Sequence, residues 1–223
     1  MKLYAIVGSP NSRKVLAVIN HLGIDIDIEY LDLFAGDTKN PAYEAINPNT
    51  MVPTLVDGDL TLWESNAINQ YLVDKSQNKH LFPHDISVRA DIVRWQCWEL
   101  AHFNQAFGTL GFEAVAKPNF LNIQGDQEVI DLSKGQLSRF ASVLNNHLQG
   151  RSYMVGNSIT LADYSIIHVE FFKETIPFDW SPFPHLNEYF DRMRQSPFWA
   201  ATAPQSPEAI GRKPEELSSK TSS

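Results

Sequence analysis

One stretch of the chain decides the fold: residues 51–72, which read MVPTLVDGDLTLWESNAINQYL. The stretch begins at Val52-Pro53, continues as two short alternating runs around Asp57-Gly58, and becomes helical in pattern from Glu64-Ser65 onward. An Asp-Gly pair between two such runs is the strongest short-range signal for a β-hairpin. We therefore expect a proline, two strands joined by a tight turn, and a helix, in this order.

The proline and the helix start predict a binding site. An X-Pro bond can be held cis, and a cis bond here exposes the backbone amide and carbonyl of Val52. An extended peptide can pair with such groups as an added strand pairs with the edge of a sheet. The helix start at Glu64-Ser65 favours a carboxylate, because free N–H groups and the positive end of the helix dipole face it. Together these features indicate a cradle for a small, acidic, extended peptide.

The surrounding residues complete a small α/β layer over residues 1–79. Residues 3–7 read as a buried strand, and a helical pattern follows that ends at Gly23. Residues 24–30 alternate as a strand with one buried face, and residues 32–50 are polar with little periodicity. The predicted order is strand, helix, strand, loop, strand, strand, helix.

Beyond residue 80 the strand patterns largely disappear. We expect a linker at 80–86, an all-helical domain at 87–203 and a flexible tail at 204–223. Long helices are predicted over about 87–107 and 126–148, and a last helix near residues 186–193. Thr160 and Asp163 have the spacing of a capping box, which predicts a helix start between them.

Composition narrows the range of functions. The 223 residues carry a net charge of −8, which argues against nucleic-acid and anionic-membrane partners. The single cysteine, Cys97, excludes an internal disulfide and a thiolate metal cluster, and its spacing predicts a buried position. We find no pattern of a signal peptide or membrane span, so a cytoplasmic location is expected.

In their order and spacing, the motifs of residues 2–200 resemble those of the cytosolic glutathione transferases. The resemblance rests on residues 9–15, on Asn47-Pro48 leading to Val52-Pro53, on Asp57-Gly58, on residues 64–72, on the Thr160–Asp163 box and on residues 184–192. It implies a thioredoxin-like N-terminal domain, an all-α C-terminal domain and a homodimer. It also implies that glutathione is a substrate and that no metal is required.

The resemblance implies a hydroxyl or amide donor for the glutathione sulfur near the start of the first helix. In serine-type relatives the catalytic hydroxyl occupies the place of Ser9, whereas Val7 and Pro10 stand where other types carry tyrosine and cysteine. Some bacterial and fungal relatives use an asparagine or threonine in a similar segment, so Asn11 is a rival. Ser12 is a third candidate, although it also suits a helix cap.

The same resemblance assigns the binding residues. Val52, before Pro53, is expected to pair with the cysteinyl part of glutathione, and Glu64 and Ser65 to hold its γ-glutamyl end. The other positions expected to contact glutathione are Lys39, Thr50, Met51 and Asn66. An apolar pocket for the second substrate is expected from His102, Phe103, Phe107 and Phe112, although phenylalanines at helical spacing also suit a core.

The expected activity is conjugation of the glutathione thiolate to hydrophobic electrophiles. Two alternatives remain open. A glutathione-dependent disulfide or peroxide reductase would draw its sulfur chemistry from glutathione, and Asn11 suits that variant. A binding module would keep the fold and the peptide cradle without turnover.

Overall fold

The computed structural model describes residues 1–214. In this part the chain forms two compact units. The first contains Met1–Leu81 and takes up the chain again from Ser196, and the second contains Phe82–Gln195. The change from an α/β unit to a helical unit therefore falls close to the linker that the sequence predicts.

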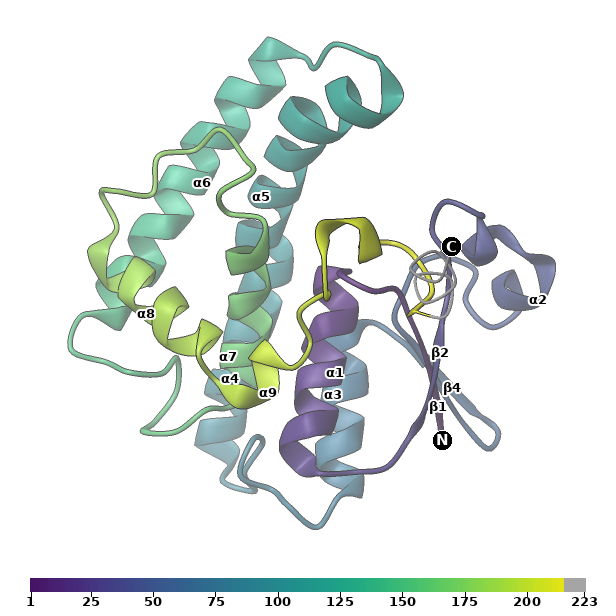
Figure 1. Cartoon of the computed structure of the whole chain (residues 1–223). Helices are drawn as coiled ribbons and strands as arrows, with labels where there is room; N and C mark the ends of the chain where they lie inside the picture. Colours follow the sequence, from purple (N-terminus) through teal and green to yellow (C-terminus); the bar gives the residue numbers. More distant parts are fainter. Residues whose placement is uncertain (215–223) are drawn as a thin grey trace. The chain divides into compact units, whose positions relative to one another are not determined.

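The first unit contains a four-stranded sheet in the order β2-β1-β3-β4. Strand β1 (Lys2–Ala5) pairs in parallel with β2 (Asp27–Tyr30) and antiparallel with β3 (Thr54–Asp57). Strand β4 (Leu60–Trp63) follows β3 through the predicted Asp57-Gly58 turn, in which Gly58 has φ of 60°. Helices α1 (Pro10–Leu22) and α3 (Ser65–Lys75) lie side by side (Figure 1). This is the thioredoxin-like layer that the sequence predicts.

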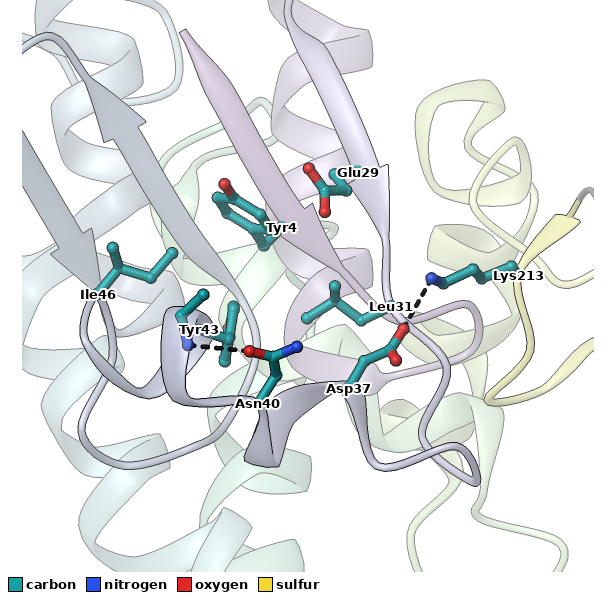
Figure 2. A pocket seen from close by; sticks show the side chains of 9 residues that line it. Tyr4, Glu29, Leu31, Asp37, Asn40, Tyr43, Ile46 and Lys213 are labelled. Atoms are coloured by element: carbon teal, nitrogen blue, oxygen red, sulfur yellow. Dashed lines mark hydrogen bonds and ion pairs between the residues drawn. The ribbon is translucent and has the colours of Figure 1, made fainter.

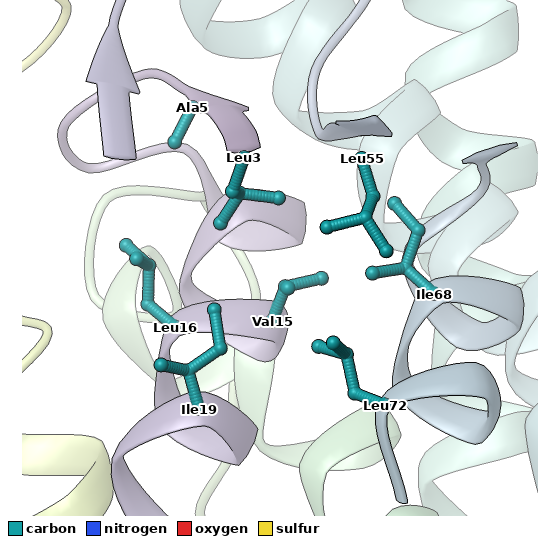
Figure 3. Packing of buried hydrophobic residues seen from close by; sticks show 8 residues of the cluster. All are labelled: Leu3, Ala5, Val15, Leu16, Ile19, Leu55, Ile68 and Leu72. Carbon is teal, nitrogen blue, oxygen red and sulfur yellow. The ribbon is translucent and has the colours of Figure 1, made fainter. Parts of the chain in front are cut away.

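The main core of the first unit lies between the sheet and these two helices (Figure 3). Every side chain of this cluster is at most 8% exposed, and its members come from β1, α1, β3 and α3: Leu3, Ala5, Val15, Leu16, Ile19, Leu55, Ile68 and Leu72. Helix α1 ends at Gly23, whose φ of 62° is the left-handed conformation that glycine adopts without steric cost. The helical spacing in the sequence predicts the buried face of α1 correctly.

A smaller core covers the other face of the sheet. It contains Ile6, Leu31 and Tyr43. Tyr43 lies on α2 (Pro41–Glu44), which follows the 3-10 turn Asp37–Lys39. These short elements occupy the polar stretch 32–50, whose low periodicity gives little sign of them.

The chain from residue 196 packs on the first unit, whereas the sequence predicts a helical domain to residue 203 and a flexible tail beyond. Trp199 of α9 (Pro197–Ala200) is fully buried, and the Arg13 guanidinium stacks on its ring at 4.0 Å. Arg13 Nε also donates a hydrogen bond to Thr202 Oγ1 at 2.9 Å. These partners are 189 residues apart in the chain, so no local pattern reveals them. Residues 215–223 of the expected tail lie outside the described residues.

The second unit is helical. Its first helical stretch contains α4 (Ile86–Trp98), the π-helical turn Glu99–Phe103, α5 (Asn104–Gly111) and a second π-helical segment (Phe112–Leu121). The stretch therefore runs beyond residue 107, where the sequence predicts its end. The remaining elements are α6 (Gln127–Leu148), α7 (Leu161–Ile166), the 3-10 helix Ile167–Phe171 and α8 (Pro184–Arg194).

The expectation that Cys97 is buried is wrong, because its side chain is exposed. The buried face of α4 is formed by Ile92, Trp95 and Gln96, and Glu99 of the following turn continues it. The buried stripe of α4 therefore lies next to the predicted one, which runs through Val93, Cys97 and Leu100.

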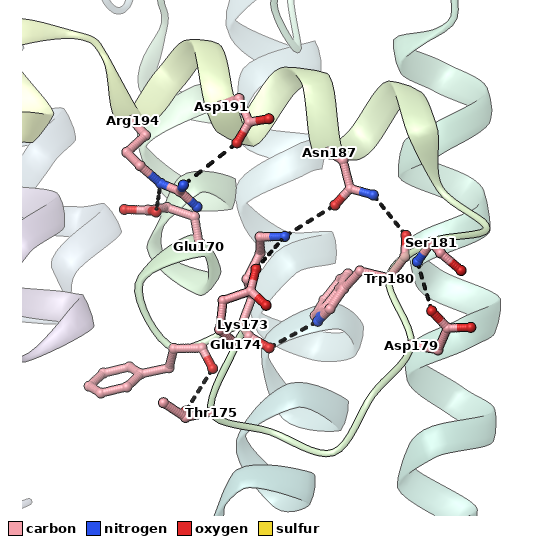
Figure 4. A network of polar contacts seen from close by, with 11 residues as sticks. Glu170, Lys173, Glu174, Thr175, Asp179, Trp180, Ser181, Asn187, Asp191 and Arg194 are labelled. Atoms are coloured by element: carbon pink, nitrogen blue, oxygen red, sulfur yellow. Dashed lines mark hydrogen bonds and ion pairs between the residues drawn. The ribbon is translucent and has the colours of Figure 1, made fainter.

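An irregular segment between the 3-10 helix and α8 is fixed by polar contacts (Figure 4). Trp180 Nε1 donates to the Lys173 carbonyl at 3.0 Å, and Asn187 Nδ2 donates to the Trp180 carbonyl at 2.7 Å. Arg194 Nε pairs with Glu170 Oε2 at 2.6 Å. The bonds from Trp180 and Asn187 satisfy backbone carbonyls that no helix or sheet pairs.

The predicted capping box at α7 is present and fully buried. Asp163 Oδ2 accepts from the Thr160 N–H at 2.8 Å, and its Oδ1 accepts from the Met154 N–H at 2.8 Å. Burial, the largest influence, raises the pKa of the Asp163 carboxyl to about 6, although the hydrogen bonds from Met154 and Thr160 act in the opposite direction. One side chain thus ties the loop before α7 to the helix start.

Asp163→Ala is expected to lower the free energy of unfolding by about 3 kcal/mol, because the buried N–H groups of Met154 and Thr160 would lose their acceptor. Asp126→Ala is the matched control, since the Asp126 carboxylate also accepts backbone N–H groups at a helix start, as the N-cap residue of α6, but is exposed. Its loss is expected to cost about 1 kcal/mol. Urea denaturation of both variants measures the difference, and equal losses would contradict the special role of the buried cap.

Candidate active site

Three loops meet at one end of the sheet because of the strand register. Tyr4 of β1 pairs with Thr54 of β3, and Thr54 pairs with Trp63 of β4. Since β3 is antiparallel to both neighbours, the loop after β1, the residues before β3 and the residues after β4 lie at the same end. Ser9, Val52-Pro53 and Glu64-Ser65, the residues of the predicted peptide cradle, belong to these three segments.

The Val52–Pro53 peptide bond is cis, as the sequence predicts. Neither the amide nor the carbonyl of Val52 is hydrogen-bonded to any residue in the range 1–214. Both groups are therefore available to an extended partner, provided that the loop holds its conformation.

A buried polar network holds this loop. The Tyr43 hydroxyl and Asn47 Nδ2 donate to the Met51 carbonyl at 2.6 and 2.8 Å. The same two groups contact Thr54 Oγ1 at 2.8 and 2.9 Å. Burial raises the pKa of the Tyr43 hydroxyl, so the group stays protonated. Tyr43 and Asn47 fix the chain on both sides of Val52-Pro53.

The start of α3 has the features of an anion site. Glu64 precedes the helix with φ of 75°, a left-handed backbone that is uncommon for a residue with a side chain and is often found at functional sites. Its side chain is exposed and does not cap the helix. Glu64 therefore provides no side-chain cap for this 11-residue helix.

Asn11 and Ser65 bring the starts of α1 and α3 together. Ser65 Oγ donates a hydrogen bond to Asn11 Oδ1 at 3.5 Å. Ser65 is buried and Asn11 is half-buried, so one face of Asn11 remains open to solvent. Two positive helix ends therefore converge on the cradle.

The two serines near the start of α1 have different environments. Ser9 is the N-cap residue, and its Oγ accepts from the Ser12 N–H at 3.3 Å while its side chain stays half-exposed. Ser12 is fully buried, and its Oγ accepts from the Ile6 N–H at 3.2 Å. Ser12 therefore cannot reach a substrate, and Ser9 rather than Ser12 caps the helix.

The other predicted binding positions vary in exposure. Lys39 is exposed and forms no ion pair with the described residues, and Met51 is 68% exposed. Thr50 is half-buried with φ of 54°, and Asn66 is buried in the first turn of α3.

Two of the four residues predicted to contact a hydrophobic substrate belong to the core of the helical unit. Phe103 is fully buried and Phe107 is 7% exposed, so neither offers a surface to a ligand. Helical spacing cannot distinguish a core face from a pocket face. Phe112 is 47% exposed, and His102 is exposed with its ring 5.2 Å from that of Phe140.

A separate cavity of about 240 Å³ lies on the α2 face of the sheet (Figure 2). It is lined by Tyr4, Glu29, Leu31, Asp37, Asn40, Ala42, Tyr43, Ile46 and Lys213. None of the residues predicted to bind glutathione lines it. Within residues 1–214, no three His, Cys, Asp or Glu side chains gather as a metal site would require, and no helix is long and apolar enough for a membrane span.

Comparison with known families gives the identity of both units. Residues 1–74 match the family "Glutathione S-transferase, N-terminal domain", and residues 103–197 match "Glutathione S-transferase, C-terminal domain". Glutathione S-transferase 3 of Zea mays is 36% identical over 165 residues, which cover 73% of each chain. The chain belongs to the glutathione S-transferase family.

Other members of the family agree with this assignment. Glutathione S-transferase D7 of Drosophila melanogaster is 31% identical over 206 residues, covering 89% of this chain and 87% of the relative. The theta class glutathione S-transferase of Xanthomonas axonopodis pv. citri, solved with glutathione bound, has a TM-score of 0.81 and 28% identity. The match covers 92% of this chain and 97% of that one.

Sequence reasoning misses Tyr43, which this glutathione S-transferase family member uses to hold the cradle loop. A tyrosine in a polar, aperiodic stretch gives no sign of burial. Asn47 is part of the family motif, but its hydrogen bonds to the far side of the proline are visible only in the fold.

Tyr43→Phe is expected to raise KM for glutathione by about threefold to tenfold, since the Met51 carbonyl and Thr54 would each lose one hydrogen bond. The value of kcat at saturating glutathione is expected to change little. Tyr4→Phe is the matched control, because the Tyr4 ring packs on Tyr43 but its hydroxyl has no hydrogen bond to the described residues. Equal KM values for both variants would refute this role of the Tyr43 hydroxyl.

Proposed function

We propose that this glutathione transferase joins the thiolate of glutathione to small hydrophobic electrophiles, with Ser9 as the donor to the sulfur. The observation that carries the proposal is the contact of Asn11 with Ser65, which joins the starts of α1 and α3 beside the unpaired backbone of Val52. A peptide bound along Val52 would direct its sulfur toward α1 and its γ-glutamyl end toward α3.

The chemistry requires a lower thiol pKa. A free thiol has a pKa of about 8.5, so little thiolate is present at neutral pH. Lowering it by about two units takes roughly 2.7 kcal/mol, which one charge-assisted hydrogen bond and a helix dipole can supply. The sulfur electron pair then forms the bond to carbon, the leaving group departs with its bonding pair, and the thiol proton goes to solvent.

Ser9 suits this role better than Asn11. The Ser9 oxygen accepts from the Ser12 N–H, which leaves the hydroxyl hydrogen free to point at a thiolate. The residue is half-exposed at the positive end of a 13-residue helix. The Asn11 side chain is joined through its oxygen to Ser65, which supports a role in orienting the γ-glutamyl end.

The two ends of glutathione would be held by charge and by the start of α3. The γ-glutamyl carboxylate would accept from N–H groups at the start of α3 and from Ser65, and the Glu64 carboxylate would accept from the ammonium group. Lys39, which is exposed, would meet the glycine carboxylate. Thr50, Met51 and Asn66 would complete the contacts.

On the helical unit, His102 and Phe112 are the exposed members of the predicted set and the better candidates for contact with the electrophile. Family membership supports a homodimer. It also supports a cytoplasmic location, and both remain part of the proposal.

Ser9→Ala is expected to lower kcat/KM for a chloronitroaromatic substrate by about tenfold or more near pH 6.5, with little change in glutathione affinity. The reason is that loss of the donor raises the pKa of the bound thiol by about one unit, which is equivalent to a tenfold loss of thiolate. Since thiolate forms at high pH in either case, the two rates should converge there. Rate against pH measures the effect.

Ser9→Thr is the matched variant, because it keeps both the hydroxyl and the helix cap. It should retain a thiol pKa close to that of the wild type. A shift in Asn11→Ala with none in Ser9→Ala would assign the sulfur donor to Asn11. A wild-type protein that binds glutathione but turns over mixed disulfides and no aryl halide would contradict conjugation and favour the reductase.

A further inference from the structure

The last part of the described chain lies against the loop that carries Ser9. We call residues 207–213 the C-terminal strap; they contain the 3-10 turn Pro207–Ala209 and the turn residues that follow it. The strap is drawn in yellow in Figure 1, near the start of α1. It belongs to the first unit.

Gly211 connects two loops through its backbone. Its N–H donates to the Val7 carbonyl at 2.9 Å, and its carbonyl accepts from the Leu33 N–H at 2.8 Å. Val7 belongs to the turn between β1 and α1, and Leu33 to the loop after β2. Gly211 has φ of 80°, and a Cβ there would lie 2.8 Å from Phe34 Cε2. Only glycine makes both bonds without strain.

Ile210 packs directly on the residue before Ser9. A Cβ at Gly8, whose φ is 78°, would lie 3.1 Å from both Cγ1 and Cγ2 of Ile210. The turn has two further ties, from Ser9 N–H to the Ile6 carbonyl at 3.1 Å and from Ile6 N–H to Ser12 Oγ at 3.2 Å. The turn is therefore held both by its own hydrogen bonds and by the packing of Ile210 of the strap.

Two ion pairs fix the end of the strap. Arg212 Nη1 lies 3.4 Å from Oδ2 of Asp32, whose side chain is almost fully buried, and its guanidinium lies over the Phe34 ring at 4.4 Å. Lys213 Nζ lies 2.8 Å from Asp37 Oδ2, as Figure 2 shows. The Asp32 carboxylate also accepts from the Ala35 N–H at 2.6 Å. The strap is thus anchored at a rigid acidic loop.

We propose that the C-terminal strap is a positioning element for catalysis, in which Ile210 and Gly211 hold the β1–α1 turn so that the Ser9 hydroxyl points at the glutathione sulfur. This inference rests on the proposed role of Ser9. The strap is bonded to Val7 and packs on Gly8, which lie in the turn that carries Ser9, so it should affect the thiolate more than the affinity for the peptide.

The test compares Ile210→Ala and Gly211→Ala with the wild type and with Glu208→Ala. Ile210→Ala removes the packing on Gly8, and Gly211→Ala introduces a side chain at φ of 80°. Glu208 is exposed in the same strap, and its carboxylate is hydrogen-bonded to Ser206, so it is the control. Three quantities are measured: glutathione affinity, the conjugation rate against pH, and the ultraviolet absorbance of bound thiolate.

We expect Ile210→Ala and Gly211→Ala to raise the apparent pKa of the bound thiol and to lower kcat/KM near pH 6.5 by about threefold to tenfold. Glutathione affinity should stay within about twofold, and Glu208→Ala should match the wild type. Arg212→Ala, which removes an anchor without touching the turn, should give a smaller change in the same direction.

Variants that fold and bind glutathione but keep the wild-type thiol pKa would overturn the inference. Parallel loss of affinity and rate would overturn it as well, since it would indicate a general structural role. Failure of the proposed function looks different. If Ser9→Ala leaves the thiol pKa unchanged, the role of Ser9 fails; if Ser9→Ala shifts it and the strap variants do not, only the inference about the strap fails.

Discussion

The antiparallel pairing of β3 between β1 and β4 is the constraint on which the site depends. The strand register, in which Thr54 lies opposite both Tyr4 and Trp63, fixes which residues lie at one end of the sheet. A slip of one residue would turn Leu55 out of the core, so burial of that side chain enforces the register. The packing of Leu55 therefore determines which loops meet at this end of the sheet, and the hydrogen bonds of Tyr43 and Asn47 then fix the loop at Val52-Pro53.

Local sequence signals predict the parts of the fold that local interactions determine. The Asp57-Gly58 hairpin, the end of α1 at Gly23, the capping box at Thr160 and the cis bond at Val52–Pro53 are all present. Each depends on residues within a few positions of one another. The burial of Trp199 depends on partners far along the chain, which no local pattern reveals. The exposure of Cys97 depends on which of two adjacent stripes of the helix faces the core, and residue spacing alone does not distinguish the two stripes.

The site illustrates the same limit for side chains of one type. Ser9 and Ser12 are three residues apart, and a serine at either position suits a helix cap or a sulfur donor. In the fold, Ser9 takes the cap because its backbone is extended, with φ of −61° and ψ of 122°, while Ser12 already lies within α1. The Ser12 side chain then turns inward to the Ile6 N–H, which would otherwise be a buried donor without an acceptor. Backbone conformation, not residue type, separates the two roles.

The first unit is not complete at residue 81. Arg13 is buried on α1, and a buried guanidinium requires partners for its charge and donors. The chain from residue 196 supplies the Trp199 ring and the Thr202 hydroxyl, and the same segment then continues to Val7 and Leu33. A fragment that ended before residue 196 would expose the apolar side of α1 and lose these partners. The first unit is therefore built from two segments that are far apart in the sequence, residues 1–81 and the chain from residue 196. The turn that carries Ser9 lies where these two segments meet.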